Sequence, residues 1–208
     1  MNVTHYDTLY ISIILRMEVE NMANTVSNVG VGKPKVGGAV FVAPKGTALP
    51  TSASEELNEA YKCLGYISED GITVSESRES EALKAWGGDT VMKNQTSYEK
   101  SVKFTAIESE NETALKVRYG TANVTKGELG ALTVKHNSVE LDHWAMVIDM
   151  ATSKDRVTRL CYPDAYASET EDITYKDSES IGLGVTMACL PGDDGDVCKE
   201  YHAAVSAS

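Results

Sequence analysis

Apolar residues stand at every second position in three segments from residue 102 onward, a pattern typical of strands with an apolar face. In the third segment the intervening positions are Gly182, Gly184, Thr186 and Ala188, so another layer is expected to pack closely above them. Residues 155–162 and 172–178 supply further strand material. The alternating apolar positions are Val102, Phe104 and Ala106; Trp144, Met146, Ile148 and Met150; and Ile181, Leu183, Val185, Met187 and Cys189.

A first helix is predicted over residues 52–64. Ser52 and Glu55 have the spacing of a capping box, and Gly65 stands where a residue with left-handed backbone ends a helix. The apolar positions at helical spacing are Leu57, Ala60, Tyr61 and Leu64.

A second, shorter helix is predicted over residues 110–119. Ser109 and Glu112 form its capping box and Gly120 ends it. Too few helices follow the strands for repeated βαβ units, so this helix lies between antiparallel strands. The pattern as a whole predicts a mainly β, antiparallel sandwich-like or barrel-like domain with one or two short α-helices and extended loops.

The N-terminal part divides into two predicted segments before the main domain at 51–208. Residues 22–50 are rich in Gly and Pro, which favours an extended arm with at most one strand. Residues 1–21 are interpreted as a non-native upstream extension. The codons for Met17–Glu18–Val19 can contain GGAGGT, a bacterial ribosome-binding sequence, shortly before a second start at Met22. The apolar run at 9–15 is too short to span a membrane.

The stretch "LGYISEDGITVSESRESEALKAWGGDTV" at 64–91 differs from every other segment. It has Gly-marked turns and many charges, and it has no apolar face long enough to form a core. The polar part, 73–82, needs neighbouring strands to be stable as sheet. Trp86 beside Gly87-Gly88 either covers an edge of the sandwich core or is an aromatic anchor at a subunit boundary.

Composition and charge narrow the function. The 208-residue chain is 42% hydrophobic and has a formal net charge of −12. A single domain of this size can bury a sizeable core. Tight binding to nucleic acid needs clustered Lys and Arg, so the acidic balance argues against it, although it permits DNA to pass nearby.

Candidate chemistry is weak throughout the sequence. The chain has no phosphate-binding, dinucleotide-binding, nucleophile-elbow or zinc-protease motif. His136, His143 and Asp142 are poorly placed to share a metal ion, and Asp193, Asp194 and Asp196 are read as a solvated acidic turn. No cofactor, metal or enzymatic activity is expected. The four cysteines form no CxxC pair, and reduced thiols, mostly buried, are expected.

In order and spacing, several motifs resemble those of the major tail (tail tube) proteins of long, non-contractile-tailed phages. The resemblance covers roughly residues 40–120. It rests on "APKGTALP" at 43–50, the Leu-Gly-Tyr-x-Ser-Glu-Asp-Gly turn at 64–71, Trp86 to Asp89, the strand at 103–108, and Tyr119-Gly120.

This resemblance implies a β-sandwich that assembles as hexameric rings, which stack into the hollow virion tube that conducts the genome into the host. It implies assembly in the bacterial cytoplasm, no membrane, and as partners other copies of the chain, the tape measure, the tail terminator and the tail tip. Glu76, Glu79 and Glu81 are the candidate lumen-facing residues, because acidic side chains repel passing phosphates. Trp86, Gly87, Gly88 and Asp89 are the candidate inter-subunit residues. Two alternatives stay open at this point: a phage head or head–tail joining protein, and a secreted β-sandwich adhesion module.

Overall fold

The computed structural model describes residue 24 and residues 29–35, 37–153 and 155–204. The chain divides into two units, one ending at Val31 and the other beginning at Gly32, and every strand of the described residues belongs to the second unit. The proposed upstream extension, residues 1–21, lies outside the described residues.

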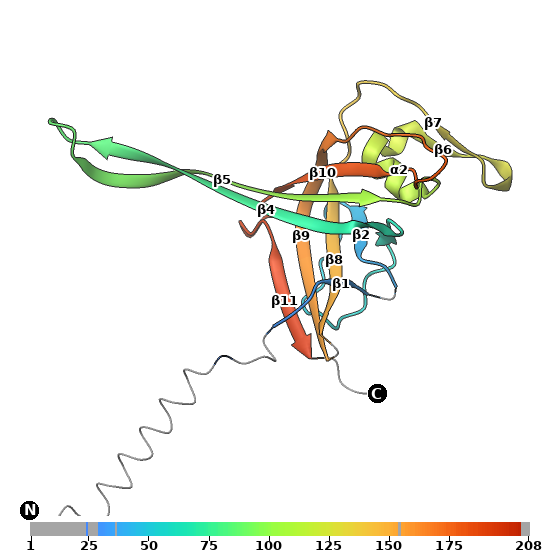
Figure 1. The fold of residues 1–208 in the computed structure, drawn as a ribbon, viewed down its shortest axis with the longest axis horizontal. Coiled ribbons are helices and arrows are strands. Elements are labelled where there is room, and N and C mark those ends of the chain that lie inside the picture. Colours follow the sequence, from blue (N-terminus) through green and yellow to red (C-terminus); the bar gives the residue numbers. More distant parts are fainter. Residues whose placement is uncertain (1–23, 25–28, 36, 154, 205–208) are drawn as a thin grey trace, which may run out of the picture. The chain divides into compact units, whose positions relative to one another are not determined.

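The second unit is mainly β, and every strand pair described is antiparallel, as the sequence pattern predicts (Figure 1). Nine strands form one sheet in the order β3-β2-β8-β9-β10-β5-β4, with β1 joined to β8 and β11 joined to β9, while β6 and β7 form a small separate sheet. The strands are β1 (Lys33–Pro34), β2 (Val40–Pro44), β3 (Lys62–Cys63), β4 (Ile67–Lys84), β5 (Thr90–Ala106), β6 (Val124–Lys126), β7 (Leu132–Val134), β8 (Trp144–Ser153), β9 (Arg156–Thr170), β10 (Leu183–Leu190) and β11 (Lys199–Ala204).

Apolar residues are buried on both faces of the central strand β8. Its predicted apolar face, with Met146 and Ile148, belongs to the larger core, which also takes in residues of the α-helix α2 (Glu112–Tyr119). The opposite face, with Ala145 and Val147, packs into a second apolar cluster. Because both faces are covered, the centre of the sheet is shielded from water on both sides.

The predicted face of β5 is confirmed, since Val102, Phe104 and Ala106 are all buried. The apolar face of β10 is likewise buried over Leu183, Val185, Met187 and Cys189. A side chain at Gly184 would collide with Glu171, and one at Gly182 would collide with Thr105. Side chains from the neighbouring strand β5 and from the residue after β9 therefore cover these small residues closely, and they belong to the same sheet. In contrast, no strand forms over 172–178, which was predicted as strand material.

The second predicted helix, 110–119, is confirmed, but it begins two residues later than predicted. The helix α2 begins at Glu112, and its N-cap is Asn111, whose Oδ1 accepts hydrogen bonds from Thr113 N and Ala114 N. Ser109 therefore does not cap it, because the Asn two residues later supplies a better-placed acceptor. Gly120 ends the helix with φ +90°, as predicted. Two short 3₁₀ turns follow, η2 (Thr121–Asn123) and η3 (Glu128–Gly130).

The first predicted helix, 52–64, is wrong, because residues 51–61 form bends, a turn and irregular backbone, and 62–63 form β3. Half of its capping box exists, since Glu55 N donates to Ser52 Oγ at 3.2 Å. The carbonyl oxygens of Ser52 and Glu55, however, accept hydrogen bonds from Arg159 Nη1 at 3.0 and 2.7 Å. A buried guanidinium thus takes two acceptors that a helix would use, and the segment covers the second apolar cluster without being helical.

Part of the segment 22–50, which was predicted as an extended arm, forms strands of the sheet. Within its described part, β2 pairs with β8 along its whole length, and Val40, Val42 and Ala43 are buried. Residues 33–34 form a second short strand, also against β8. Residues 33–34 and 40–44 are therefore part of the folded sheet, because the short apolar run at 40–43 fills a place beside the central strand.

Candidate functional site

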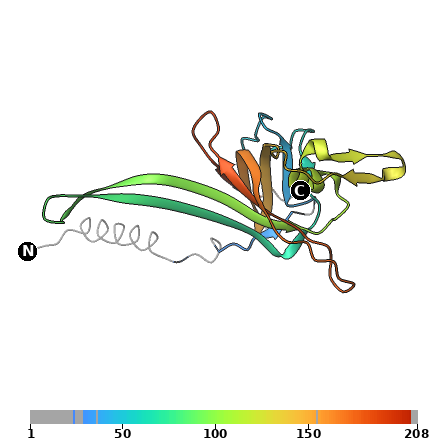
Figure 2. The ribbon, with the colours of Figure 1, turned by 90° about the horizontal axis from the view of Figure 1, so that it is seen from above.

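The stretch at 64–91 contributes most of a long hairpin that projects from the sheet (Figures 1 and 2). Strand β4 pairs with β5 from Ile72 opposite Phe104 to Lys84 opposite Thr90. Strand β10 pairs with β5 only from Ala106 to Lys100. Beyond Glu76 and Lys100, which oppose each other, the hairpin has two strands only; residues 73–99 are called the projecting hairpin. Both of its long edges are unpaired among the described residues.

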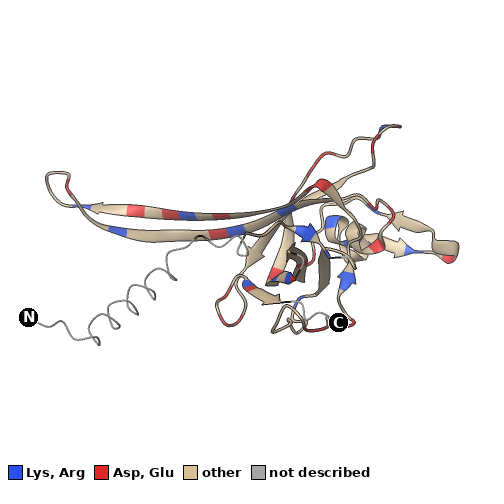
Figure 3. Ribbon diagram, turned by 60° about the horizontal axis from the view of Figure 1, so that its bottom comes forward, with Lys and Arg blue, Asp and Glu red and all other residues tan. Residues whose placement is uncertain are grey.

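The register assigns each side chain of the projecting hairpin to one of two faces, because residues alternate along a strand and directly opposed residues share a face. One face continues the core face of β5 and is called the core-side face. It carries three basic residues and one acid, Arg78, Lys84, Lys93 and Glu76, and Lys100 adds a fourth base at the foot of the hairpin. The other, called the acidic face, carries three acids beyond residue 75: Glu79, Glu81 and Glu99. Figure 3 shows these charges spread along both strands.

On the core-side face, Glu76 is held in a charged cluster. Arg78 donates to its carboxylate at 2.8 and 3.0 Å, and Lys100 Nζ lies 3.5 Å away. The Arg78 guanidinium also lies over the ring of Tyr98, 4.4 Å from the centroid. The hydrogen bonds from Arg78 are the main cause that lowers the pKa of Glu76 below its usual value. Glu76 is therefore ionised at neutral pH, with its charge locally balanced.

The three acids predicted to face a lumen do not share one surface of the chain. Glu79 and Glu81 lie on the acidic face, opposite Ser97 and Asn94, where the described residues provide no ion-pair partner for them. Glu76 lies on the other face. Only Glu79 and Glu81 can thus act together as a repulsive surface, and Glu99 joins them from β5. Sequence reasoning missed Glu99 because its face depends on the hairpin register.

The predicted inter-subunit residues form the tip of the hairpin. Ala85 N donates to Asp89 O at 2.8 Å and Gly88 N donates to Ala85 O at 3.0 Å. Gly87 and Gly88 have φ of +113° and +98°, a conformation that disfavours other residues. The Trp86 side chain is fully exposed. The interpretation of Trp86 as a plug at the edge of the core is therefore wrong.

Other apolar side chains surround the tip Trp. Leu83, Val91 and Met92 are each more than half exposed. Leu83 and Met92 oppose each other in the ladder and lie on the acidic face. Exposed apolar groups gathered at the end of a long projection are typical of a contact surface for another molecule.

The three residues considered as metal ligands, His136, Asp142 and His143, each contact a different neighbour. His143 Nδ1 lies 2.5 Å from Asp164 Oδ1, whereas the His136 ring packs against Tyr119 with 4.6 Å between centroids. Asp142 accepts a hydrogen bond from Thr121 N. In the part of the chain that the structure describes, no three His, Cys, Asp or Glu side chains are grouped as a metal site.

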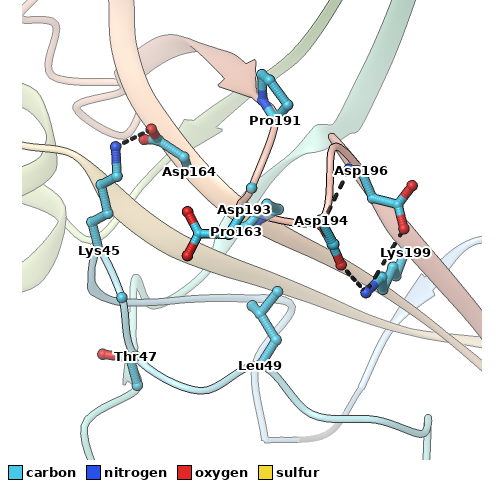
Figure 4. A pocket seen from close by; sticks show the side chains of 12 residues that line it. Lys45, Thr47, Leu49, Pro163, Asp164, Pro191, Asp193, Asp194, Asp196 and Lys199 are labelled. Atoms are coloured by element: carbon cyan, nitrogen blue, oxygen red, sulfur yellow. Dashed lines mark hydrogen bonds and ion pairs between the residues drawn. The ribbon is translucent and has the colours of Figure 1, made fainter.

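The acidic turn at 191–196 borders an open cavity of about 370 Å³ (Figure 4). Lys199 forms ion pairs with Asp194 and Asp196, and Lys45 Nζ lies 2.5 Å from Asp164 Oδ2. Lysines thus neutralise most of the acids that border the cavity. The turn is a solvated, ion-paired loop, as the sequence indicated.

All four cysteines are among the described residues and all are free. Cys161 and Cys189 are buried, and burial raises the pKa of each thiol to about 12. Neither can supply a nucleophilic thiolate at neutral pH.

These features define a class of protein: a mainly antiparallel β-protein whose sheet extends into a long hairpin with edges that are unpaired among the described residues. Comparison with protein-family models matches residues 29–202 to the phage tail tube protein family, so the chain belongs to that family and is a component of the virion tail. A search of curated proteins finds no significant match to the chain. No helix in the described ranges is long and apolar enough to cross a membrane.

Proposed function

We propose that copies of this chain assemble through the projecting hairpin into stacked hexameric rings, forming the tube through which the genome of a long, non-contractile-tailed phage passes. The observation that carries the proposal is the pair of unpaired edges along residues 73–99. An isolated two-stranded ribbon is at best marginally stable in water. Pairing the β4 edge of one copy with the β5 edge of the next would complete both strands.

The geometry of such pairing favours a closed ring. The β4 edge and the β5 edge are different surfaces, so the contact is heterologous, and a heterologous contact closes when its rotation completes a circle. Closure gives every hairpin two neighbours and removes the exposed edges. A tube of stacked rings also needs a second contact between rings.

The acidic face is the proposed lumen surface. Glu79 and Glu81 have no ion-pair partner among the described residues, and repeated copies would line a channel with negative charge. DNA phosphates would be repelled from such a wall and would slide past it. Glu76 points to the opposite face in this arrangement, next to Arg78 and Lys100.

The remaining parts of the proposal follow from the family. The chain assembles in the bacterial cytoplasm, acts structurally without enzymatic activity or a cofactor, and meets the tape measure, tail terminator and tail tip proteins at the ends or inside of the tube. The match to a tail tube family disfavours a head, head–tail joining or adhesion role.

A register-preserving truncation tests the proposal. Glu76 and Lys100 oppose each other in the ladder, so replacing residues 77–99 with Asn-Gly closes a short hairpin between them. Every residue removed lies outside the buried core. We expect the intact chain to form rods or rings by negative-stain microscopy at high concentration, and the truncated chain to stay a folded monomer. Monomeric behaviour of the intact chain, or rods from the truncated one, contradicts the proposal.

A further inference from the structure

A groove of about 520 Å³ lies at the base of the hairpin, where β4 begins beside β1 and β8. Its walls are mostly apolar side chains and glycine backbone. Tyr66 stands at the groove with most of its side chain exposed. The apolar and aromatic residues of the lining are Pro34, Ala39, Tyr66, Ile67, Ile72 and Met150.

One polar residue of the lining, Ser68, has an Oγ that is buried without a hydrogen-bond partner among the described residues. Because this atom is closed off from solvent, it is not open to a donor placed in the groove. The apolar walls therefore decide the preference, and the preferred occupant is a mainly apolar group.

The hairpin tip presents such a group. Trp86 is fully exposed, its indole is apolar over most of its surface, and its Nε1–H is a donor that needs an acceptor when buried. Trp is also the residue type most enriched among the energetically dominant contacts of interfaces. The indole and the groove thus complement each other in chemistry.

The tip of a hairpin cannot reach the groove of the same chain. The groove ends at Ile72 and the hairpin runs on to Lys84, which is 12 residues of paired strand, or about 40 Å at the usual rise per residue. The paired strands hold the tip away from the base. A Trp86 that fills the groove would then come from a second copy, displaced by about this distance along the hairpin.

Charges around the two surfaces are also complementary. Two lysines, Lys84 and Lys93, lie near the tip, where Asp89 offsets one of their charges, so the tip stays basic. Glu69 lines the groove with Asp70 next to it, and the one lysine of the lining, Lys35, is paired with Asp149. Glu69, Asp70, Lys84 and Lys93 have no ion-pair partner among the described residues. Basic groups at the tip would therefore approach acidic groups beside the groove, which favours the encounter and its orientation.

From these observations we propose that Trp86 of one copy inserts into the groove at the base of the hairpin of a second copy. The contact rests on the proposed tube assembly and supplies its second interface, the one between successive rings. A single Trp buries only about 150–250 Å², which is small for a stable interface. Several such contacts acting together between two rings make stacking strong although each contact is weak.

Cysteine cross-linking between two single variants tests the contact directly. Trp86→Cys and Tyr66→Cys are purified separately, mixed at a concentration where rods form, and oxidised. A disulfide between position 86 of one copy and position 66 of another is expected as the dominant covalent dimer. The matched control replaces Tyr66→Cys by Tyr175→Cys, because Tyr66 and Tyr175 are equally exposed, at 76% and 75%. Each variant is also oxidised alone, which shows how many cross-links come from the four native cysteines or from two copies of the same variant.

The result separates this inference from the tube proposal. Rods that form without cross-links above the Tyr175→Cys level overturn the Trp86 contact and leave the tube intact. That outcome would also be seen if the chain's own N-terminal residues filled the groove. Absence of any polymer from the unmodified chain overturns both. Selective 86–66 cross-links in rods support both.

An assembly measurement gives an independent check. Trp86→Ala is expected to leave the fold intact, because the side chain is fully exposed, and to raise the concentration needed for stacked rods by about thirtyfold or more. Trp86→Phe should recover part of the loss, and Tyr175→Ala should change little. Lys84→Glu should weaken stacking, and Glu69→Lys in the same chain should restore it. Equal stacking by Trp86→Ala and the unmodified chain overturns the proposal.

Discussion

Single buried charges connect distant parts of this sheet. Asp149 on β8 accepts two hydrogen bonds from Arg159 on β9, at 2.6 and 2.8 Å, and the same guanidinium binds carbonyls of the 52–55 segment. The hydrogen bonds that Arg159 donates to Asp149 are the main cause that raises the pKa of Arg159. The Arg159–Asp149 ion pair therefore holds the 52–55 segment in a non-helical loop, although the spacing of its residues predicts a helix.

Asp164 likewise joins distant residues, since it binds Lys45 and His143. Removing its charge should lower stability in a way that depends on pH. Burial by itself would raise the pKa of Asp164, but hydrogen bonds from Lys45 and His143 lower it below its usual value. A lowered folded-state pKa gives stability that is present above the unfolded pKa, about 4, and is lost as pH falls through the folded pKa. We expect Asp164→Asn to lower the free energy of unfolding by about 1–3 kcal/mol at pH 7.

Urea unfolding followed by circular dichroism at pH 7 and at pH 3 or below checks this prediction. The difference in the free energy of unfolding between Asp164→Asn and the unmodified chain should become smaller as the pH falls. Asp193→Asn is the control, because Asp193 borders the same cavity but is exposed and has no ion pair in the described part of the chain. A difference that stays constant with pH would show that the charge of Asp164 is not responsible.

At the scale of elements, the projecting hairpin divides its charges between two faces. The core-side face is predominantly basic with Glu76 paired, and the acidic face carries Glu79, Glu81 and Glu99. The division follows from the two-residue period of a strand, which sends neighbouring residues to opposite sides. A tube wall made of these hairpins would therefore present different charges inside and outside.

Reversing charge on one face only is the corresponding test. In phage particles that carry Glu79→Lys and Glu81→Lys, we expect genome ejection to slow by several-fold, because lysines would hold the phosphates that glutamates repel. The tubes themselves should remain intact. The measurement is the rate of DNA release after triggering, followed by dye fluorescence.

A matched variant places lysines on the other face of the same strand. Ser80→Lys and Ala82→Lys lie next to the two glutamates but alternate to the core-side face. These changes should leave ejection close to normal. Equal slowing by both variants, or none by the first, would show that Glu79 and Glu81 do not line the lumen.

At the scale of the whole molecule, the described sheet is stabilised without covalent cross-links between its strands. The thiols of Cys161 and Cys189 are buried on different strands, and at pH 8 a pKa of about 12 leaves roughly one thiol in ten thousand ionised. Stability comes instead from the two apolar clusters and the buried ion pairs.

This predicts the chemical behaviour of the folded chain. Iodoacetamide at pH 8 should leave Cys161 and Cys189 unmodified in the native protein and should label both after unfolding in urea, as read by peptide mass spectrometry. Dithiothreitol should not change the midpoint of thermal unfolding. A midpoint that falls with reductant would point to a disulfide and would agree better with a secreted adhesion module.

Much of the fold could be predicted because strand periodicity is local. The apolar faces of β5, β8 and β10 follow from alternation alone, and Gly65, Gly87 and Gly120 occupy positive-φ positions where the sequence marks turns or stops. The helix at 52–64 could not be excluded from sequence, because its competitor, Arg159, lies more than 100 residues away. Local propensity decides only where no distant partner competes for the same backbone groups.

The sequence by itself determined the β class, the second helix and the unusual character of residues 64–91, because each depends on residue types and spacing within one segment. Only the tertiary structure decided that this stretch builds a projecting hairpin, that Trp86 stands at its tip, and that Glu76 faces away from Glu79 and Glu81. The reason is register: which residues oppose each other across two strands depends on where the turn falls and on each bulge.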